Sequence, residues 1–297
     1  MSVSEIHTKT LPEALAELEA LASDDSVVFR GHSNVSWRLG STLARYSTVP
    51  HRPWDTLIDE LLSHFMNGLA SVGQLPSRKM DRRARLEFGR HYGVPSPLID
   101  FTLSPYVALF FAFDGIRPEP TKPDEEVVVY ALALTSLAVD WAKRGGSFDS
   151  EYSSFMYERE DMFPNGLFPH GYPAGILKFI RFPASWNTRM LRQMGAFLYD
   201  TLDYRLQGKL DLEDFITAIQ EPAGVAGKPS QTLVKVFIPK SIASNVFSRL
   251  ELMGMTGARL MDDHVGAAAD VYNSYNYNRR TGYTWDLLMP PPDDAMM

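Results

Sequence analysis

The chain of 297 residues contains no cysteine, so disulfide bonds, thiolate nucleophiles and cysteine-ligated zinc sites are all excluded. No stretch reaches the roughly 18 consecutive apolar residues that a membrane-spanning helix requires. The opening segment, MSVSEIHTKT, lacks the apolar core of a secretory signal peptide. No glycine-rich loop follows an expected strand, which leaves a Rossmann or P-loop nucleotide site without support. We therefore expect a cytoplasmic protein with no membrane partner.

The chain also has fewer basic residues (29) than acidic ones (36). The formal net charge is -7, which disfavours broad binding to nucleic acid, because such binding needs a basic face along the phosphate backbone. The densest basic run, within residues 78–90, is interpreted as a solvated helix face. Hydrophobic residues make up 45% of the chain, which is enough to bury a sizeable core.

No internal repeat or low-complexity tract divides the chain. We expect one domain over residues 1–297, with its core at about 20–270 and a frayed C-terminal tail at 287–297. Residues 143–175 are rich in Gly, Pro, Ser and aromatic residues without periodicity. They are interpreted as a long irregular insertion, a kind of segment that is often functional when it is ordered.

Apolar spacing, capping residues and short apolar runs predict a succession of helices and strands. The expected helices begin at the Thr10 capping box, at Ser104-Pro105 and at Ser241, or cover 55–72, 81–91 and 188–193. The expected strands are 26–30, 127–134, 176–182, 195–199 and 232–238. Because the helices between the strands are of uneven length, we expect an α+β (mixed α/β) fold with a central mixed or antiparallel sheet flanked by helices.

The first group of polar residues in apolar surroundings is Phe29-Arg30-Gly31-His32. An arginine at the end of a buried strand is costly unless it is paired or binds an anion, and its planar fork suits a carboxylate or a phosphate. Gly31 would let a ligand approach the backbone. The alternative is a buried Arg30 that is paired with a structural aspartate.

A second group lies within residues 90–102 and contains His91, Tyr92, Asp100 and Thr102. These side chains are close in sequence to the helix expected after Ser104, which is apolar nearly all round. Asp100 could orient His91 or pair with Arg30. A histidine beside a turn is more often a satisfied polar side chain than a functional group.

Two more groups lie toward the C-terminus. Arg189 and Gln193 are one helical turn apart, so both can face one side, although a polar face that meets water is an equal alternative. Asp262, Asp263 and His264 are adjacent. Three adjacent residues point in different directions, so we expect no metal site there.

The ordered set of these groups resembles the signatures of the FRG-domain family over roughly residues 20–270. Phe29-Arg30-Gly31, with Trp37, Leu39 and Arg45 downstream, is similar to the motif that names the family. Residues 91–95, Leu98, Asp100 and the Ser104-Pro105 helix resemble its second and most specific signature. Arg189, Gln193, Gly195 and Phe197 resemble the third signature, and residues 260–266 resemble the C-terminal motif in degraded form.

The chain also departs from the family pattern. Arg90 stands where glutamine is usual, Ser96-Pro97 where Thr-Arg is usual, Phe101 where tryptophan is usual, and Met261-Asp262 where Phe-Pro is usual. An arginine that the family carries near the pocket is therefore missing at Pro97. Such changes could alter substrate choice or activity.

The resemblance implies a bacterial protein associated with toxin or phage-defence genes. A strand that ends in aromatic-Arg-Gly also looks like the first strand of arginine-type ADP-ribosyltransferases, in which the arginine contacts NAD. That likeness implies an ADP-ribosyltransferase-like core, with NAD as co-substrate and no metal. The candidate catalytic residues are Arg30, His91 and Asp263; the candidate ligand-binding residues are Gly31, Tyr92, Asp100, Thr102, Arg189 and Gln193.

The acid that such a reaction needs is not marked by a Glu-x-Glu motif on a late strand. A carboxylate stabilises an oxocarbenium-like ribosyl cation as it does in glycosidases. Asp262 or Asp263 would serve, or Glu158 or Glu160 from the insertion.

Three hypotheses remain open. The first is an NAD-consuming ADP-ribosyltransferase or NAD glycohydrolase, a toxin or defence effector with a protein or nucleic-acid target and an antitoxin or immunity protein as partner. The second is a non-catalytic module that binds a ligand or a protein, because no acid or nucleophile stands out. The third is a nuclease that uses Arg30, His91 and Asp100, which the acidic net charge disfavours.

Overall fold

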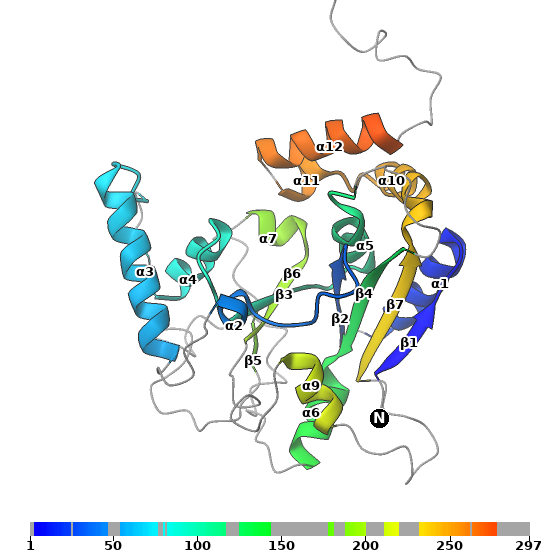
Figure 1. Cartoon of the computed structure of the whole chain (residues 1–297), viewed down its shortest axis with the longest axis horizontal. Coiled ribbons are helices and arrows are strands. Elements are labelled where there is room, and N and C mark those ends of the chain that lie inside the picture. The colour runs from blue at the N-terminus through cyan, green and yellow to red at the C-terminus, as the bar shows by residue number, and fades with distance from the viewer. Residues whose placement is uncertain are drawn as a thin grey trace, which may run out of the picture.

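The computed structural model describes residues 3–24, 26–46, 54–76, 80, 82–116, 125–143, 178–180, 188–199, 211–219, 232–261 and 263–277. The strands in these ranges form one seven-stranded sheet with helices on both faces (Figure 1). The expected α+β fold, with helices flanking a mixed sheet, is confirmed.

The sheet has the order β1-β7-β4-β2-β3-β6-β5. The strands are β1 (Ser4–His7), β2 (Val27–His32), β3 (Leu98–Thr102), β4 (Glu126–Ala133), β5 (Lys178–Ile180), β6 (Gly195–Tyr199) and β7 (Leu233–Pro239). β1 is parallel to β7, and every other pairing is antiparallel. β2 pairs with β4 along its whole length, but it meets β3 at a single position, Phe29 opposite Thr102. The sheet is therefore weakly joined between β2 and β3.

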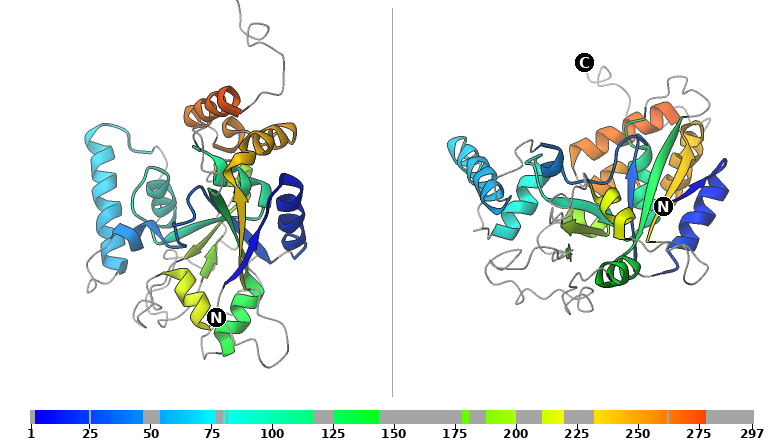
Figure 2. Two further views of the ribbon diagram at one scale, coloured as in Figure 1. Left: turned by 45° about the vertical axis from the view of Figure 1, so that its right-hand side comes forward. Right: turned by 60° about the horizontal axis from the view of Figure 1, so that its bottom comes forward.

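The helices divide into groups that cover different parts of the sheet (Figure 2). They are α1 (Leu11–Leu21), α2 (Thr42–Tyr46), α3 (Trp54–Ser71), α4 (Arg82–His91), α5 (Pro105–Phe113), α6 (Leu134–Lys143), α7 (Thr188–Arg192), α9 (Leu212–Ile219), α10 (Ala243–Leu252), α11 (Gly257–Met261) and α12 (His264–Tyr277), with a 3-10 turn η3 (Lys240–Ile242) before α10. Residues 144–177, which contain most of the expected insertion, lie outside the described residues.

One face of the sheet packs against α1, α5 and α10. Phe29, Val129 and Val236 from the strands meet Phe110 of α5 and Val246 of α10 in one buried cluster. α5 is buried almost all round, as its sequence predicts. Its start is fixed by Ser104, whose hydroxyl accepts a hydrogen bond from the Val107 N–H at 3.3 Å, and by Pro105 in the first turn.

The opposite face of the sheet packs against α6 and α9. Val28, Val128 and Tyr130 from the strands meet Leu137 of α6 and Leu212 of α9. β4 is therefore buried on both faces, which is why its sequence is a continuous apolar run instead of an alternating one.

A third, smaller cluster lies under α3 and α4, at the side of the sheet formed by β3 and β6. Ile58 and Leu62 of α3 and Leu86 of α4 pack with Leu98 of β3 and Phe197 of β6. Figure 1 shows these two helices standing on the side of the molecule away from β1 and α1. The α6/α9 face still packs across the β2–β3 junction, because Val28 of β2 shares one buried cluster with Ile99 and Phe101 of β3.

Candidate functional site

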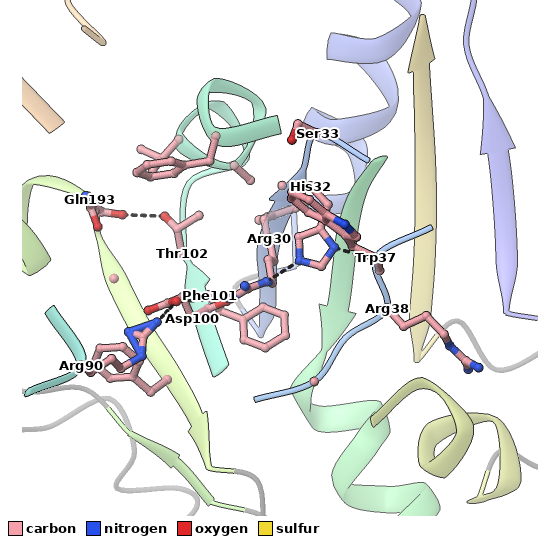
Figure 3. Close-up of a pocket in the computed structure, with 18 of the residues that line it drawn as sticks. Arg30, His32, Ser33, Trp37, Arg38, Arg90, Asp100, Phe101, Thr102 and Gln193 are labelled. Atoms are coloured by element: carbon pink, nitrogen blue, oxygen red, sulfur yellow. Dashed lines mark hydrogen bonds and ion pairs between the residues drawn. The ribbon is translucent and has the colours of Figure 1, made fainter. Parts of the chain in front are cut away.

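A cleft of about 880 Å³ lies along β2 and β3, where the two strands separate (Figure 3). Its volume is within the usual range for small-molecule sites. Side chains from both strands, from the segment that follows β2 and from α4, α5, α7 and β6 line the cleft. The charged and aromatic lining residues are Phe29, Arg30, His32, Trp37, Arg38, Arg45, Glu87, Arg90, Asp100, Phe101, Phe111, Arg189, Phe197 and Asp211.

Successive side chains of β2 point to opposite faces of the sheet, so three neighbouring residues have different roles. Phe29 is fully buried in the core beneath α5. Arg30 turns to the opposite face and lines the cleft. Gly31 returns to the α5 face, where a Cβ would lie 2.0 Å from the Ala108 carbonyl oxygen and 2.6 Å from the Ala112 nitrogen. The glycine is thus required for the close packing of α5 on β2; its expected role in ligand approach stays a prediction, although Gly31 also lines the cleft.

The Arg30 guanidinium is held by three hydrogen bonds. Its Nε donates to His32 Nε2 at 2.7 Å, and its Nη1 donates to the Asp100 carbonyl oxygen at 2.8 Å and to the Asp100 carboxylate at 3.4 Å. The side chain is only 20% exposed. Of the two roles considered for Asp100, the structure shows the pairing with Arg30, and this pair lies in the cleft.

His32 is the neutral tautomer with its proton on Nδ1. Nδ1 lies 2.9 Å from the Trp37 carbonyl oxygen, which can only accept, so Nδ1 donates and Nε2 is left to accept from Arg30. Burial, together with the positive charge of Arg30, lowers the pKa of His32 to about 4. The imidazole is therefore uncharged at neutral pH and serves Arg30 as an acceptor.

Asp100 bridges two arginines. Its carboxylate pairs with Arg90 Nη2 as well as with Arg30, and it is still 47% exposed toward the cleft. Arg90 Nε donates to the Leu98 carbonyl oxygen at 3.4 Å, and its guanidinium carbon lies 5.0 Å from the centre of the Phe197 ring. The chain therefore supplies a guanidinium to the cleft from α4, at the position where the family usually has glutamine, while Pro97 carries none.

The positive charge of the cleft is only partly compensated. Burial lowers the pKa of Arg30 to about 10 and that of Arg90 to about 9, with repulsion between the two arginines as a further cause for Arg90. Burial and the charge of Arg30 also lower the pKa of Arg45. Arg30 and Arg90 are still protonated at neutral pH, and one carboxylate, Asp100, bridges them. Such an arrangement favours an anion as ligand.

Arg189 and Gln193 contact the C-terminal group of residues, through Leu260 and Asp263, at the edge of the cleft. The Thr102 hydroxyl donates to the Gln193 carbonyl oxygen at 2.6 Å, and Gln193 Nε2 donates to the Leu260 carbonyl oxygen at 3.0 Å. Arg189 Nη1 lies 3.6 Å from the Asp263 carboxylate. Thr102, Arg189 and Gln193 all line the cleft, and their expected role in ligand binding stays a prediction. Gln193 also connects the end of α7 to α11, and Arg189 connects α7 to Asp263, the residue before α12.

Two candidates from the sequence stand apart from the cleft lining. Asp263 precedes α12, where its carboxylate accepts a hydrogen bond from the Gly266 N–H at 2.9 Å; that bond lowers the pKa of Asp263. Its position explains the residue as a helix cap. Tyr92 is 63% exposed and packs with Phe65 and Phe88, with ring centres 6.1 and 4.9 Å away.

The remaining candidates are less fully defined. His91 is the last residue of α4, and its side chain lies outside what the structure describes. Asp262, Glu158 and Glu160 lie outside the described residues. In the described ranges, no group of three or more His, Cys, Asp or Glu residues is placed to hold a metal ion. Among the helices described, none is both long enough and apolar enough to cross a membrane.

Sequence reasoning did not assign a role to several residues of the cleft. Arg38, Glu87 and Asp211 line the cleft but belong to none of the sequence motifs, and His32 was considered only as a neighbour of Arg30. Trp37, Arg45 and Arg90 stood at family positions without an expected contact. Their positions depend on loops and helices that come together in three dimensions, so a local sequence pattern could not identify them.

In a comparison with known families, residues 25–120 match the FRG domain, and the matched residues include Arg30, Arg45, Arg90 and Asp100. No curated protein and no solved structure matches the chain.

Proposed function

We propose that the cleft binds the diphosphate of NAD and that the chain is an ADP-ribosyltransferase-like enzyme. The observation that supports this most strongly is the convergence of Arg30, Arg45 and Arg90, with lowered pKa values, on one cleft in which Asp100 bridges Arg30 and Arg90. Guanidinium groups bind phosphate oxygens through paired, charge-assisted hydrogen bonds. Arg30 and Arg90, whose side chains are only 20% and 17% exposed, gain more from such a ligand than exposed arginines do.

The rest of the cleft suits the other parts of the same ligand. Trp37, which is 55% exposed, and Phe111 offer aromatic surface beside the arginines. Arg30 is fixed in place before a ligand arrives, so little conformational entropy remains to be lost on binding. As an effector of this kind, the protein would act in the cytoplasm on a protein or nucleic-acid target and be controlled by an antitoxin or immunity protein.

The acid for this chemistry would come from inside the cleft. Asp100 and Glu87 both line it, whereas Asp263 caps α12. NAD as co-substrate would provide the ADP-ribosyl group that is transferred, with nicotinamide as the leaving group. The chain's part is to hold the diphosphate with Arg30 and Arg90, and to place a carboxylate near the bond that is cleaved.

NAD turnover tests the proposal. Purified protein is incubated with NAD and with candidate targets, bacterial lysate protein and RNA, while nicotinamide release is followed. We expect release by the wild type and a decrease of about 100-fold in Arg30→Ala, because the main phosphate ligand is removed. Arg249→Ala, an exposed arginine on α10, is the matched control and should leave the rate unchanged. Equal rates in wild type and Arg30→Ala, or no release with any target, would refute the enzymatic proposal.

A non-catalytic binding module is the second candidate, and one observation favours it. Asp100 is held by two arginines, and Asp211 pairs with Arg38 Nε at 2.9 Å, so these two carboxylates of the cleft are already engaged. Binding of NAD that needs Arg30 but produces no nicotinamide would support this candidate over the enzyme.

A further inference from the structure

A continuous set of contacts lies behind Arg30 and leads to α9, which is outside the matched residues 25–120. It begins at Glu213, whose side chain is only 3% exposed. The Glu213 carboxylate accepts a hydrogen bond from the Leu39 backbone N–H at 2.8 Å and pairs with Lys235 Nζ at 2.6 Å. A buried carboxylate is tolerated because both of its oxygens have partners.

The same end of α9 holds the neighbouring part of the segment that follows β2. Arg38 pairs with Asp211 at 2.9 Å and with Asp214 at 2.6 Å, and the Leu212 N–H donates to the Leu39 carbonyl oxygen at 3.1 Å. Residues 38 and 39 are therefore fixed by both side-chain and backbone contacts to α9.

Trp37 directly precedes the two fixed residues, and its backbone carbonyl oxygen makes the next contacts toward Arg30. That oxygen accepts from His32 Nδ1 at 2.9 Å and lies 2.9 Å from the Tyr130 hydroxyl. The Tyr130 hydroxyl is also 3.0 Å from the Glu213 carboxylate. Burial, strengthened by the Glu213 charge, raises the pKa of Tyr130, so the phenol stays neutral and keeps the one proton that it can donate to either of these acceptors.

We propose that His32 and Glu213 are positioning residues for Arg30. Glu213 fixes the backbone at Leu39 and thereby the Trp37 carbonyl; that carbonyl holds His32 in its Nδ1-protonated tautomer; and His32 Nε2 holds the Arg30 guanidinium. Neither residue needs to touch the ligand.

This arrangement determines which edge of Arg30 is offered to a ligand. His32 occupies Nε, and Asp100 occupies Nη1. Within the part of the chain that the structure describes, Nη2 makes no hydrogen bond to protein, so its two N–H groups are available. The inference rests on the proposed function only in assigning anion binding to Arg30; the tautomer of His32 and its dependence on Glu213 are independent of any ligand.

The first test measures the His32 tautomer directly, in the full chain and without ligand. Long-range ¹H–¹⁵N NMR of protein labelled at histidine distinguishes a protonated from an unprotonated ring nitrogen, and His32→Gln identifies the His32 signals by their loss. We expect wild-type His32 to be protonated at Nδ1 only at pH 7, and Glu213→Leu, which leaves the Leu39 N–H without its acceptor, to lose this single pattern. Glu5→Leu, at an exposed glutamate on β1, is the control. Protonation at Nε2, or an unchanged pattern in Glu213→Leu, would overturn the proposal.

A double variant removes the ambiguity of misfolding. Glu213→Leu alone leaves Lys235 without its carboxylate in a largely buried place, which can prevent folding. Glu213→Leu combined with Lys235→Met carries neither charge and has no acceptor for the Leu39 N–H. We expect the same loss of the His32 pattern in this variant, and retention of the pattern would contradict the role of Glu213.

The second test measures binding of inorganic pyrophosphate by calorimetry. His32→Leu removes the acceptor for Arg30 and should weaken binding about tenfold, whereas His32→Gln keeps an amide oxygen as acceptor and should retain most of the affinity. Equal losses in the two variants would mean that His32 acts only through packing. If the wild type does not bind pyrophosphate, the proposed function is in question, and the NMR measurement still decides the positioning role.

Discussion

At the scale of single residues, the site depends on how polar groups are compensated where water is scarce. Arg30 is compensated by a neutral imidazole, a backbone carbonyl and a shared carboxylate, which is less than a full countercharge. The sequence offered a pairing of Arg30 with Asp100 as one of two alternatives, because a charged residue at the end of a buried strand needs a partner. It could not predict the tautomer of His32, which depends on a carbonyl oxygen that a loop brings into place.

Asp263 shows a different case. The sequence offered it as the acid of the proposed reaction, but aspartate is also favoured at the start of a helix. The structure places Asp263 at the start of α12, where it accepts a hydrogen bond from the Gly266 N–H. Capping and catalytic aspartates look alike in a single sequence, so this capping role could not be predicted, and the catalytic role stays a prediction.

The neutral state of His32 gives a pH dependence of stability. In the unfolded chain the imidazole takes up a proton below its ordinary pKa of 6.5, whereas the folded state resists protonation until about pH 4. The unfolded state therefore binds more protons in this window, and stability falls as the pH drops from 6.5 to 4, by up to about 3 kcal/mol from this group. Chemical denaturation at several pH values should give a shallower slope for His32→Gln than for wild type. His64→Gln, at an exposed position of α3, should keep the wild-type slope, and a wild-type slope in His32→Gln would contradict the assignment.

At the scale of elements, strong local sequence signals predicted most of the helices and strands that surround the cleft. The amphipathic run at 55–72 is observed as α3, the segment at 81–91 as α4, and the Ser104-Pro105 start as α5. β3 was missed because LIDFT is short and interrupted by a charged residue, and it is a strand only because β6 pairs along its whole length. α6, which begins at Leu134 directly after β4, was also missed, since an apolar run continues across the boundary.

The packing of α5 on β2 gives a prediction for Gly31. A methyl group at this position would lie 2.0 Å from a backbone oxygen of α5, which cannot move away as a flexible side chain can. Gly31→Ala should lower the free energy of unfolding by about 3 kcal/mol or more. Gly40→Ala is the matched control, because a Cβ at Gly40 meets nothing within 4 Å, and its effect should stay within about 0.5 kcal/mol. Urea denaturation of both variants checks the difference, and similar midpoints would show that the approach of α5 to β2 is not close.

At the scale of the whole molecule, the cleft is built by parts of the chain that lie far apart in sequence. The matched FRG domain supplies β2, α4, β3 and α5, but Arg189, Gln193 and Phe197 come from beyond residue 120, as does Asp211. The strand order brings these parts together by placing β6 beside β3. A long-range strand order of this kind is not encoded in any local pattern. The sequence patterns therefore identified the separate groups of polar residues, and only the resemblance to a family suggested that they belong to one site.

The central claim is that the arginines of this cleft bind the phosphates of NAD. Calorimetric titration of NAD into the wild type, Arg30→Ala and Arg249→Ala tests it most directly. We predict one site per chain in the wild type and in Arg249→Ala, affinity that falls as salt is added, and at least about tenfold weaker binding in Arg30→Ala. Equal affinity in wild type and Arg30→Ala, or no binding of NAD by the wild type, would contradict the claim.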